Sequence, residues 1–191
     1  MRIGLRLGAL AFALTLAACS SIPIGTASKL RGLDYLNDDV ANLLIAFDLP
    51  QSLEPLPDGS TLSFDAKSPS GERHIKATLV PADADDLAGT LPPPADNRNY
   101  YLFGFSDADK QAIREAQASL RPAGHDTLIS ISLNPRLCRT EPIDPARVTV
   151  SALIALPGVS GLSPLLSNMP LSTVLATSPT KDVPACAGHS G

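Results

Sequence analysis

The stretch Tyr100-Tyr101-Leu102-Phe103-Gly104-Phe105 decides the fold, and Ser106 follows it directly. Tyr101, Phe103 and Phe105 stand at every second position, so a strand here places three aromatic rings on one face. Such a face could serve as a ligand platform. A sandwich core needs the same residues, and we favour the core.

A helix is expected after this strand, from Asp107 to about Leu120. Ser106 suits the N-cap position, and Asp107 and Asp109 place negative charge at the amino end of the helix dipole. Arg121-Pro122 and Gly124 then end the helix. Small or apolar residues form one stripe along it: Ala108, Ala112, Ile113, Ala116 and Leu120.

Further strands are expected on both sides of this unit. Thr61–Lys67 and Glu72–Val80 alternate apolar and polar residues across a short turn, which predicts an antiparallel hairpin. Thr127–Leu133 and Val148–Leu156 are also predicted strands. Val40–Leu49 is read as a strand, although a short helix fits its apolar run.

The remaining segments are predicted to be mostly irregular. Leu53–Gly59, Pro81–Asn99 and Asn134–Pro145 carry the prolines, acids and turn residues of loops. Between Leu162 and Met169 apolar residues alternate irregularly with Pro, Ser and Asn, so no regular element is expected there. A weak strand is predicted over Leu171–Ala176.

The fold class predicted from this order is mainly β. We expect an antiparallel β-sandwich, with an immunoglobulin-like arrangement as one version, carrying one amphipathic helix near 107–120. The high proline content, 18 residues of 191, favours short strands and loops over long helices.

The amino end has the features of an export signal. Arg2 and Arg6 precede an apolar segment, Leu7–Leu16, that is too short to span a bilayer. The run Leu16-Ala17-Ala18-Cys19 closes it and resembles the lipobox of bacterial lipoproteins. The resemblance implies removal of residues 1–18, lipid on the sulfur of Cys19 and an anchor on the periplasmic side of a membrane. An ordinary secretory signal with an incidental cysteine is the alternative.

Length and composition suggest how the mature chain is organised. Residues 19–29 would form a tether, residues 30–176 a single β-rich domain and residues 177–191 a loose tail. Ser20, in place of Asp, favours the outer over the inner membrane. The body is similar only to small β-rich envelope lipoproteins of uncharacterised activity, so this likeness implies no chemistry.

Charge argues against nucleic acid as a partner. Without residues 1–18 the chain has 13 Lys and Arg (15 − 2) against 19 Asp and Glu, a net charge of −6, with no basic cluster. The partners we expect are the membrane, through lipid on Cys19, and an envelope protein that the sequence does not name.

Cys138 and Cys186 are the two other cysteines. An even pair in an oxidising compartment predicts a disulfide. Two free thiols or a metal site are the alternatives; the metal site is disfavoured because there is no C-x-x-C and no histidine cluster.

The sequence shows no catalytic signature, and we expect a non-catalytic binding or assembly subunit without cofactor or metal. His74 is expected on the solvent side of its strand, and His189 lies in the tail. A small hydrolase using Ser160 or His125 is one alternative, although Ser160 lacks the strand–helix setting of a nucleophile elbow. A carrier of a small ligand is the other alternative and would need a deep apolar cavity.

The candidate contact surface is apolar and lies late in the chain. It either caps the core or stands exposed, and it consists of Leu162, Leu165, Leu166 and Met169.

Overall fold

The computed structural model describes residues 33–56, 59–69, 71–83, 85, 87, 91–178 and 181–187. The predicted signal segment, Cys19 and the predicted tether lie outside these residues. The elements, in chain order, are η1 (Val40–Asn42), β1 (Leu44–Pro50), β2 (Leu53–Pro55), β3 (Thr61–Ser68), β4 (Gly71–Pro81), β5 (Arg98–Phe105), α2 (Asp107–Leu120), η3 (Arg121–Asp126), β6 (Leu128–Asn134), β7 (Leu137–Arg139), β8 (Thr149–Ala155), β9 (Leu162–Pro170) and α3 (Leu171–Thr177).

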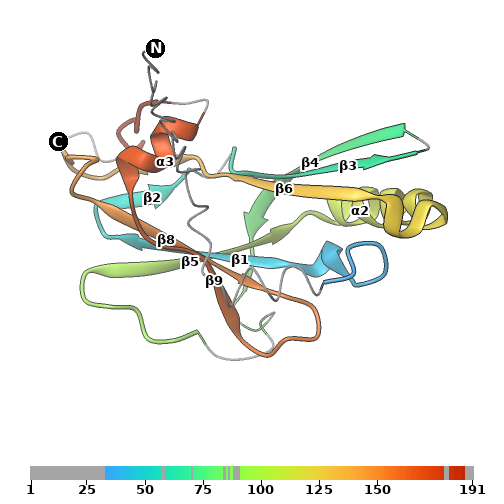
Figure 1. Cartoon of the computed structure of the whole chain (residues 1–191). Coiled ribbons are helices and arrows are strands. Elements are labelled where there is room, and N and C mark those ends of the chain that lie inside the picture. Colours follow the sequence, from blue (N-terminus) through green and yellow to red (C-terminus); the bar gives the residue numbers. More distant parts are fainter. Residues whose placement is uncertain are drawn as a thin grey trace, which may run out of the picture.

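One curled antiparallel sheet dominates the molecule (Figure 1). Its seven strands follow the order β6-β3-β4-β5-β1-β8-β9, and β2 and β7 form a separate pair. The predicted mainly-β, sandwich-like class is therefore confirmed. An immunoglobulin-like fold would need two separate sheets, whereas the two layers here are halves of one sheet.

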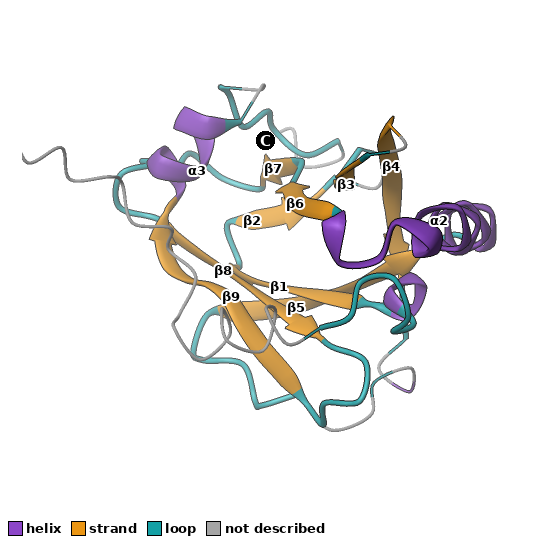
Figure 2. Ribbon diagram, turned by 45° about the vertical axis from the view of Figure 1, so that its right-hand side comes forward, coloured by secondary structure: helices purple, strands orange, loops and turns teal. Residues whose placement is uncertain are grey.

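The sheet curls where β4 changes partners. Gly71–Thr78 of β4 pairs with β3, and Leu79–Pro81 pairs with Phe103–Phe105 of β5. One half therefore consists of β6, β3 and the start of β4, and the other of β5, β1, β8 and β9 (Figures 1 and 2). Apolar side chains from both halves fill the space between them.

A second connection joins the two halves at another place. β2 directly follows β1, β7 directly follows β6, and the two short strands pair antiparallel from Leu53↔Arg139 to Pro55↔Leu137. Both lie inside segments that were predicted to be loops. Three residues are too few for a periodic signal, so only the pairing across the fold defines these strands.

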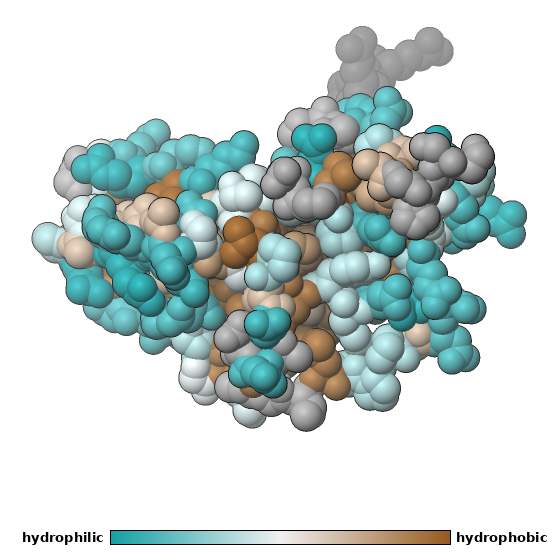
Figure 3. All heavy atoms as spheres, turned by 180° about the vertical axis from the view of Figure 1, so that it is seen from behind, coloured by the Kyte–Doolittle hydropathy of each residue, from teal (hydrophilic) through white to brown (hydrophobic). Residues whose placement is uncertain are grey.

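The helix after the aromatic strand is confirmed with its predicted bounds. The Ser106 hydroxyl accepts a hydrogen bond from the Asp109 N–H at 3.1 Å, which caps α2. The buried face of α2 consists of Ile113, Gln117 and Leu120. Its outer surface is polar, as the hydrophilic end on the left of Figure 3 shows.

The aromatic strand contributes to the core, as we favoured. The Phe103 ring packs on Phe47 with centroids 5.4 Å apart, and Phe105 meets Phe64 edge-on at 6.2 Å. Tyr101 packs against the same core and is only partly buried. These pairs connect β5 to β1 on one side of the curl and to β3 across it.

The prediction for residues 162–177 was wrong. Leu162–Pro170 forms strand β9, and Leu171–Thr177, predicted as a weak strand, forms helix α3. Proline is tolerated in β9 because this strand lies at the edge of the sheet, where only one side needs backbone donors. Leu171 is completely buried and packs into the core.

A smaller difference concerns the first strand. Val40–Asn42, predicted as its beginning, forms a turn of 3-10 helix, and the strand starts at Leu44. The hairpin of β3 and β4 and the strands β6 and β8 are confirmed with small shifts at their ends.

Candidate functional site: an apolar cleft between β6 and β9

A cleft of 440 Å³ lies between the two edge strands of the curled sheet. The strand order places β6 at one end of the sheet and β9 at the other, and the curl brings both to the same opening. The two edge strands of one sheet, β6 and β9, thus form opposite walls of one apolar space.

The β6 wall is built by strict alternation. Ile129, Ile131 and Leu133 line the cleft, while Ser130 and Ser132 lie on the opposite, exposed face. The register sets each of the three apolar residues beside an inward residue of β3; Ile131, for example, is opposite Phe64. The alternation of apolar and polar residues in β6 therefore produces a continuous apolar wall on one face of the strand.

Three of the four residues of the predicted contact surface form the β9 wall. Leu165, Leu166 and Met169 line the cleft and are half-buried, whereas Leu162 is not among its lining residues. The pairing of β9 with β8 shifts its register between Ala152 and Leu153, which lie opposite Leu166 and Pro164. Leu165 is therefore an extra residue of β9 at this point, and the adjacent leucines Leu165 and Leu166 both line the cleft.

The floor of the cleft belongs to the hydrophobic core. Phe47 and Leu49 of β1 and Leu62 of β3 line it, and each is at most 3% exposed. Val150, Ala152 and Ile154 of β8 continue the floor toward β9. A ligand in the cleft would contact well-packed residues whose positions are fixed from below.

Tyr35 forms part of the rim, and α2 fixes its position. The Gln117 amide nitrogen donates hydrogen bonds to the Tyr35 and Asp38 carbonyl oxygens, both at 2.8 Å. The Arg121 guanidinium donates a third bond to the Leu36 carbonyl at 3.0 Å. Burial raises the pKa of the Tyr35 hydroxyl, consistent with an apolar rim.

The lining of the cleft is almost entirely apolar. No Asp, Glu, Lys, Arg or His is among its lining residues, and its one hydroxyl besides Tyr35 belongs to Ser151. The Ser151 hydroxyl already accepts a bond from the Asn168 N–H at 3.0 Å. The walls offer dispersion contacts and exclusion of water, with no nucleophile–base pair among them.

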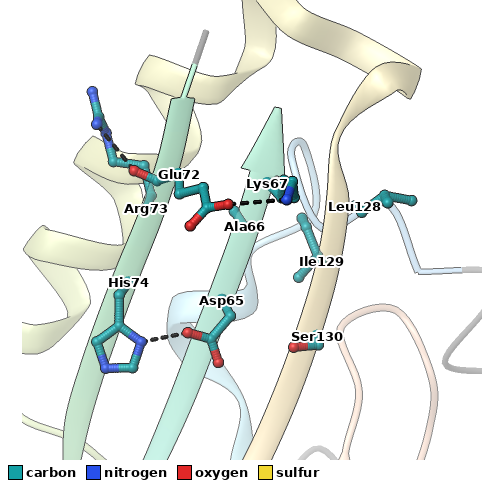
Figure 4. A pocket seen from close by; sticks show the side chains of 9 residues that line it. All are labelled: Asp65, Ala66, Lys67, Glu72, Arg73, His74, Leu128, Ile129 and Ser130. Atoms are coloured by element: carbon teal, nitrogen blue, oxygen red, sulfur yellow. Dashed lines mark hydrogen bonds and ion pairs between the residues drawn. The ribbon is translucent and has the colours of Figure 1, made fainter. Parts of the chain in front are cut away.

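Polar side chains cluster instead on the outer face of β3, β4 and β6 (Figure 4). His74 is hydrogen-bonded to Asp65, and Lys67 pairs with Glu72 at 3.1 Å; all four are exposed. The register places Asp65 between His74 and Ser130, whereas a hydrolytic triad needs the imidazole between serine and carboxylate. His74 lies on the solvent face, as predicted.

Of the other candidates for hydrolysis, Ser160 is not among the residues that line the cleft. Ser160 lies exposed in the turn between β8 and β9, and a strand, not a helix, follows it. His125 lies in η3, and its side chain is outside what the structure describes, as is all of His189.

A second polar cluster lies on the face of β1 that is opposite Phe47. The Arg98 guanidinium meets the Asp48 carboxylate at 2.6 Å and also donates to the Asp48 and Thr149 carbonyl oxygens at 2.6 and 3.3 Å. The pKa of the Tyr100 hydroxyl is raised, mainly by burial and also by the negative charge of Asp48. The positive charge of Arg98 has a smaller, lowering effect on the same pKa. This cluster ties β1, β5 and β8 together.

Cys138 and Cys186 lie at disulfide distance, with their sulfur atoms 2.10 Å apart. Arg139 N–H donates to the Pro184 carbonyl at 2.8 Å, so backbone bonds also hold this part of the tail against β7. The Glu54 carboxylate is close to both sulfurs. A disulfide leaves no thiolate for a metal, so the arrangement fits a bridge.

Sequence reasoning missed the β6 wall. Ile129, Ile131 and Leu133 were assigned to an ordinary strand, because alternation alone does not separate a core face from an open one. One signal was present: Leu128–Asn134 contains neither a charged residue nor a proline, which is unusual for a strand at a sheet edge.

Within the described residues, no helix has the length and apolar character needed to cross a membrane. Comparison with protein-family models, curated proteins and solved structures finds no match for the chain.

Proposed function

We propose that this protein is a non-catalytic binding lipoprotein of the cell envelope. The lipid on Cys19 anchors it on the periplasmic side of a membrane, in the outer membrane rather than the inner. The cleft between β6 and β9 then binds an apolar part of a partner or ligand. The cleft supports binding, and the lipobox supports the location.

One observation carries the binding proposal. The cleft has 440 Å³ of space, yet its lining is apolar on both walls and on the floor. Leaving such a surface in water is unfavourable, and open apolar patches on folded proteins commonly mark contact sites. An apolar occupant would remove this surface from water at no cost of buried charge.

The position of the cleft suits a short membrane tether. Tyr35, on its rim, lies close to Leu33, the first described residue. Between Cys19 and Leu33 there are 14 backbone steps (33 − 19), which span at most about 50 Å. The cleft would therefore stay near the membrane surface.

A carrier of a small apolar ligand is the second candidate. The same observation favours it, because 440 Å³ falls within the usual range of roughly 300–1,000 Å³ for small-molecule sites. Both versions make the cleft the binding site and differ only in its occupant.

The location is tested by labelling cells with palmitate. The wild-type protein should incorporate the label, and Cys19→Ala should give an unlabelled precursor that keeps its signal segment. An unlabelled wild type would rule out the lipoprotein proposal.

The cleft is tested with a neutral fluorophore, N-phenylnaphthylamine, and the chain from Ser20 onward, which keeps every described element. Ile131→Lys puts a charge into the β6 wall, and Ser130→Lys puts the same charge on the outer face of the same strand. We expect fluorophore binding by the wild type and Ser130→Lys, and at least about tenfold weaker binding by Ile131→Lys. Equal binding by all three would contradict the assignment.

A further inference from the structure

We propose that the occupant of the cleft is an extended polypeptide segment that adds a strand to the free edge of β6. This inference rests on the proposed function and specifies its ligand. The segment is uncharged and carries an apolar side chain at every second position. Three features of β6 support it: its free edge, its composition and the direction of its side chains.

The first feature is the open edge itself. Among the described strands, β6 pairs only with β3, so the backbone groups on its other side meet no described strand. Exposed edges template the addition of further strands, and proteins normally protect them with charges, prolines or bulges. β6 has none of these over Leu128–Asn134. Leu128, 72% exposed, is the one large hydrophobic residue that stands fully open among the described residues.

The opposite edge is protected. β9 carries Pro164 and Pro170, its pairing with β8 is irregular, and Asn168 has a positive φ of 48°. Each of these features hinders a regular ladder along β9. The contrast between the two edges of one sheet indicates that the β6 edge is kept available.

The third feature is the side-chain pattern next to that edge. A strand paired with β6 continues its pleat, so every second side chain of the added segment would point into the cleft beside Ile129, Ile131 and Leu133. The alternate side chains would lie beside Ser130 and Ser132 on the exposed face. This alternation defines the partner: apolar inward, small and polar outward.

A single segment fits better than a second copy of this chain. β6 and β9 line one common cavity, so β9 bounds the space beside β6. One strand can occupy a bounded space, whereas the continuing sheet of a second copy would meet β9. An acyl chain would fill the cleft but would leave the edge N–H and C=O groups of β6 without a protein partner.

The test uses a synthetic peptide of about nine residues, of which seven match the 7 residues of β6 and two are added at the ends. It alternates serine with isoleucine or leucine and has a lysine at each end for solubility. Its control has the same side chains but N-methyl groups on alternate backbone nitrogens that face β6. Methylation removes the N–H donors needed for pairing and leaves the apolar side chains unchanged. Two control peptides are made, one methylated on the odd-numbered and one on the even-numbered nitrogens, because either set can face β6.

We expect the unmodified peptide to bind the chain from Ser20 onward and to displace N-phenylnaphthylamine. One of the two methylated peptides should bind at least about tenfold more weakly. Ile131→Lys should abolish binding, and Ser130→Lys should retain it. If Ile131→Lys fails to fold by circular dichroism, Leu166→Lys on the other wall replaces it.

The outcomes separate the two proposals. If neither methylated peptide loses affinity, or if a fluorescent fatty acid binds while the peptide does not, strand addition is refuted and the apolar cleft remains the binding site. If concentration-dependent dimerisation blocks the cleft, the occupant is a second copy and strand addition by a partner is also refuted. If peptide, fatty acid and fluorophore all fail to bind the folded protein, the proposed function itself is refuted.

Discussion

Replacing Gln117 by leucine should loosen the segment that carries the rim of the cleft. The Gln117 side chain is buried, and its amide nitrogen makes both of the 2.8 Å bonds to the Tyr35 and Asp38 carbonyls. Leucine has a similar size and keeps the apolar contacts of α2, so the change removes hydrogen bonds with little loss of packing.

The size of the effect follows from the two bonds. Each contributes about 0.5–1.5 kcal/mol net, and the carbonyls that lose their partner lie in a partly buried position. We therefore expect the free energy of unfolding to fall by about 2 kcal/mol. For a domain of this size that corresponds to a drop in melting temperature of roughly 4–8 °C.

Urea unfolding of the wild type and of Gln117→Leu measures this directly. Gln111→Leu is the matched control, because Gln111 lies on the same helix but bonds only to the exposed Glu115 side chain. It should change stability by less than about 0.5 kcal/mol. Hydrogen exchange should also speed up selectively around Tyr35. If Gln117→Leu were as stable as Gln111→Leu, the two bonds would not hold the rim and the reasoning would be wrong.

Three further predictions concern the walls, the bridge and pH. Leu165→Asp combined with Leu166→Asp should abolish fluorophore binding and lower the melting temperature, because both half-buried side chains face the apolar cleft; unchanged binding would contradict their placement. Replacing Cys138 and Cys186 by alanine should lower stability to urea by up to about 4 kcal/mol, given their separation of 48 residues; no change would argue against a bridge. Tyr100 has a pKa raised above 10.0, so the unfolded chain ionises first and stability should fall as pH rises past 10.0, less so in Tyr100→Phe; identical alkaline profiles by circular dichroism would count against this.

Local signals made part of the fold predictable. The strand and the helix after it were predicted correctly, because their signals lie in consecutive residues. These signals are the alternation of Tyr101, Phe103 and Phe105 and the cap at Ser106. The hairpin of β3 and β4 was predictable for the same reason, because its turn and both of its patterns are contiguous.

The rest depends on contacts between distant segments. Pro164 and Pro170 argue against a strand in isolation, and β9 exists because β8 supplies its one ladder at the edge of the sheet. The curl likewise depends on where β4 exchanges β3 for β5, which no local pattern records. The sequence pointed to Leu165, Leu166 and Met169 as a contact surface or a cap of the core, and these residues line one wall of the cleft. The cleft itself and its β6 wall were not predicted.

The short joints between the two halves have a mechanical consequence. β4 and β5 share only three paired positions, and β2 and β7 likewise three, whereas β3 pairs with β4 over eight. Force applied between the halves acts first on these joints, so each half moves as a stiff shell and the joints flex. The width of the cleft therefore depends on these joints and on the core that both halves share. Because Cys138 lies in β7, its bridge to Cys186 fastens the carboxyl-terminal tail to one of these joints and not to the other.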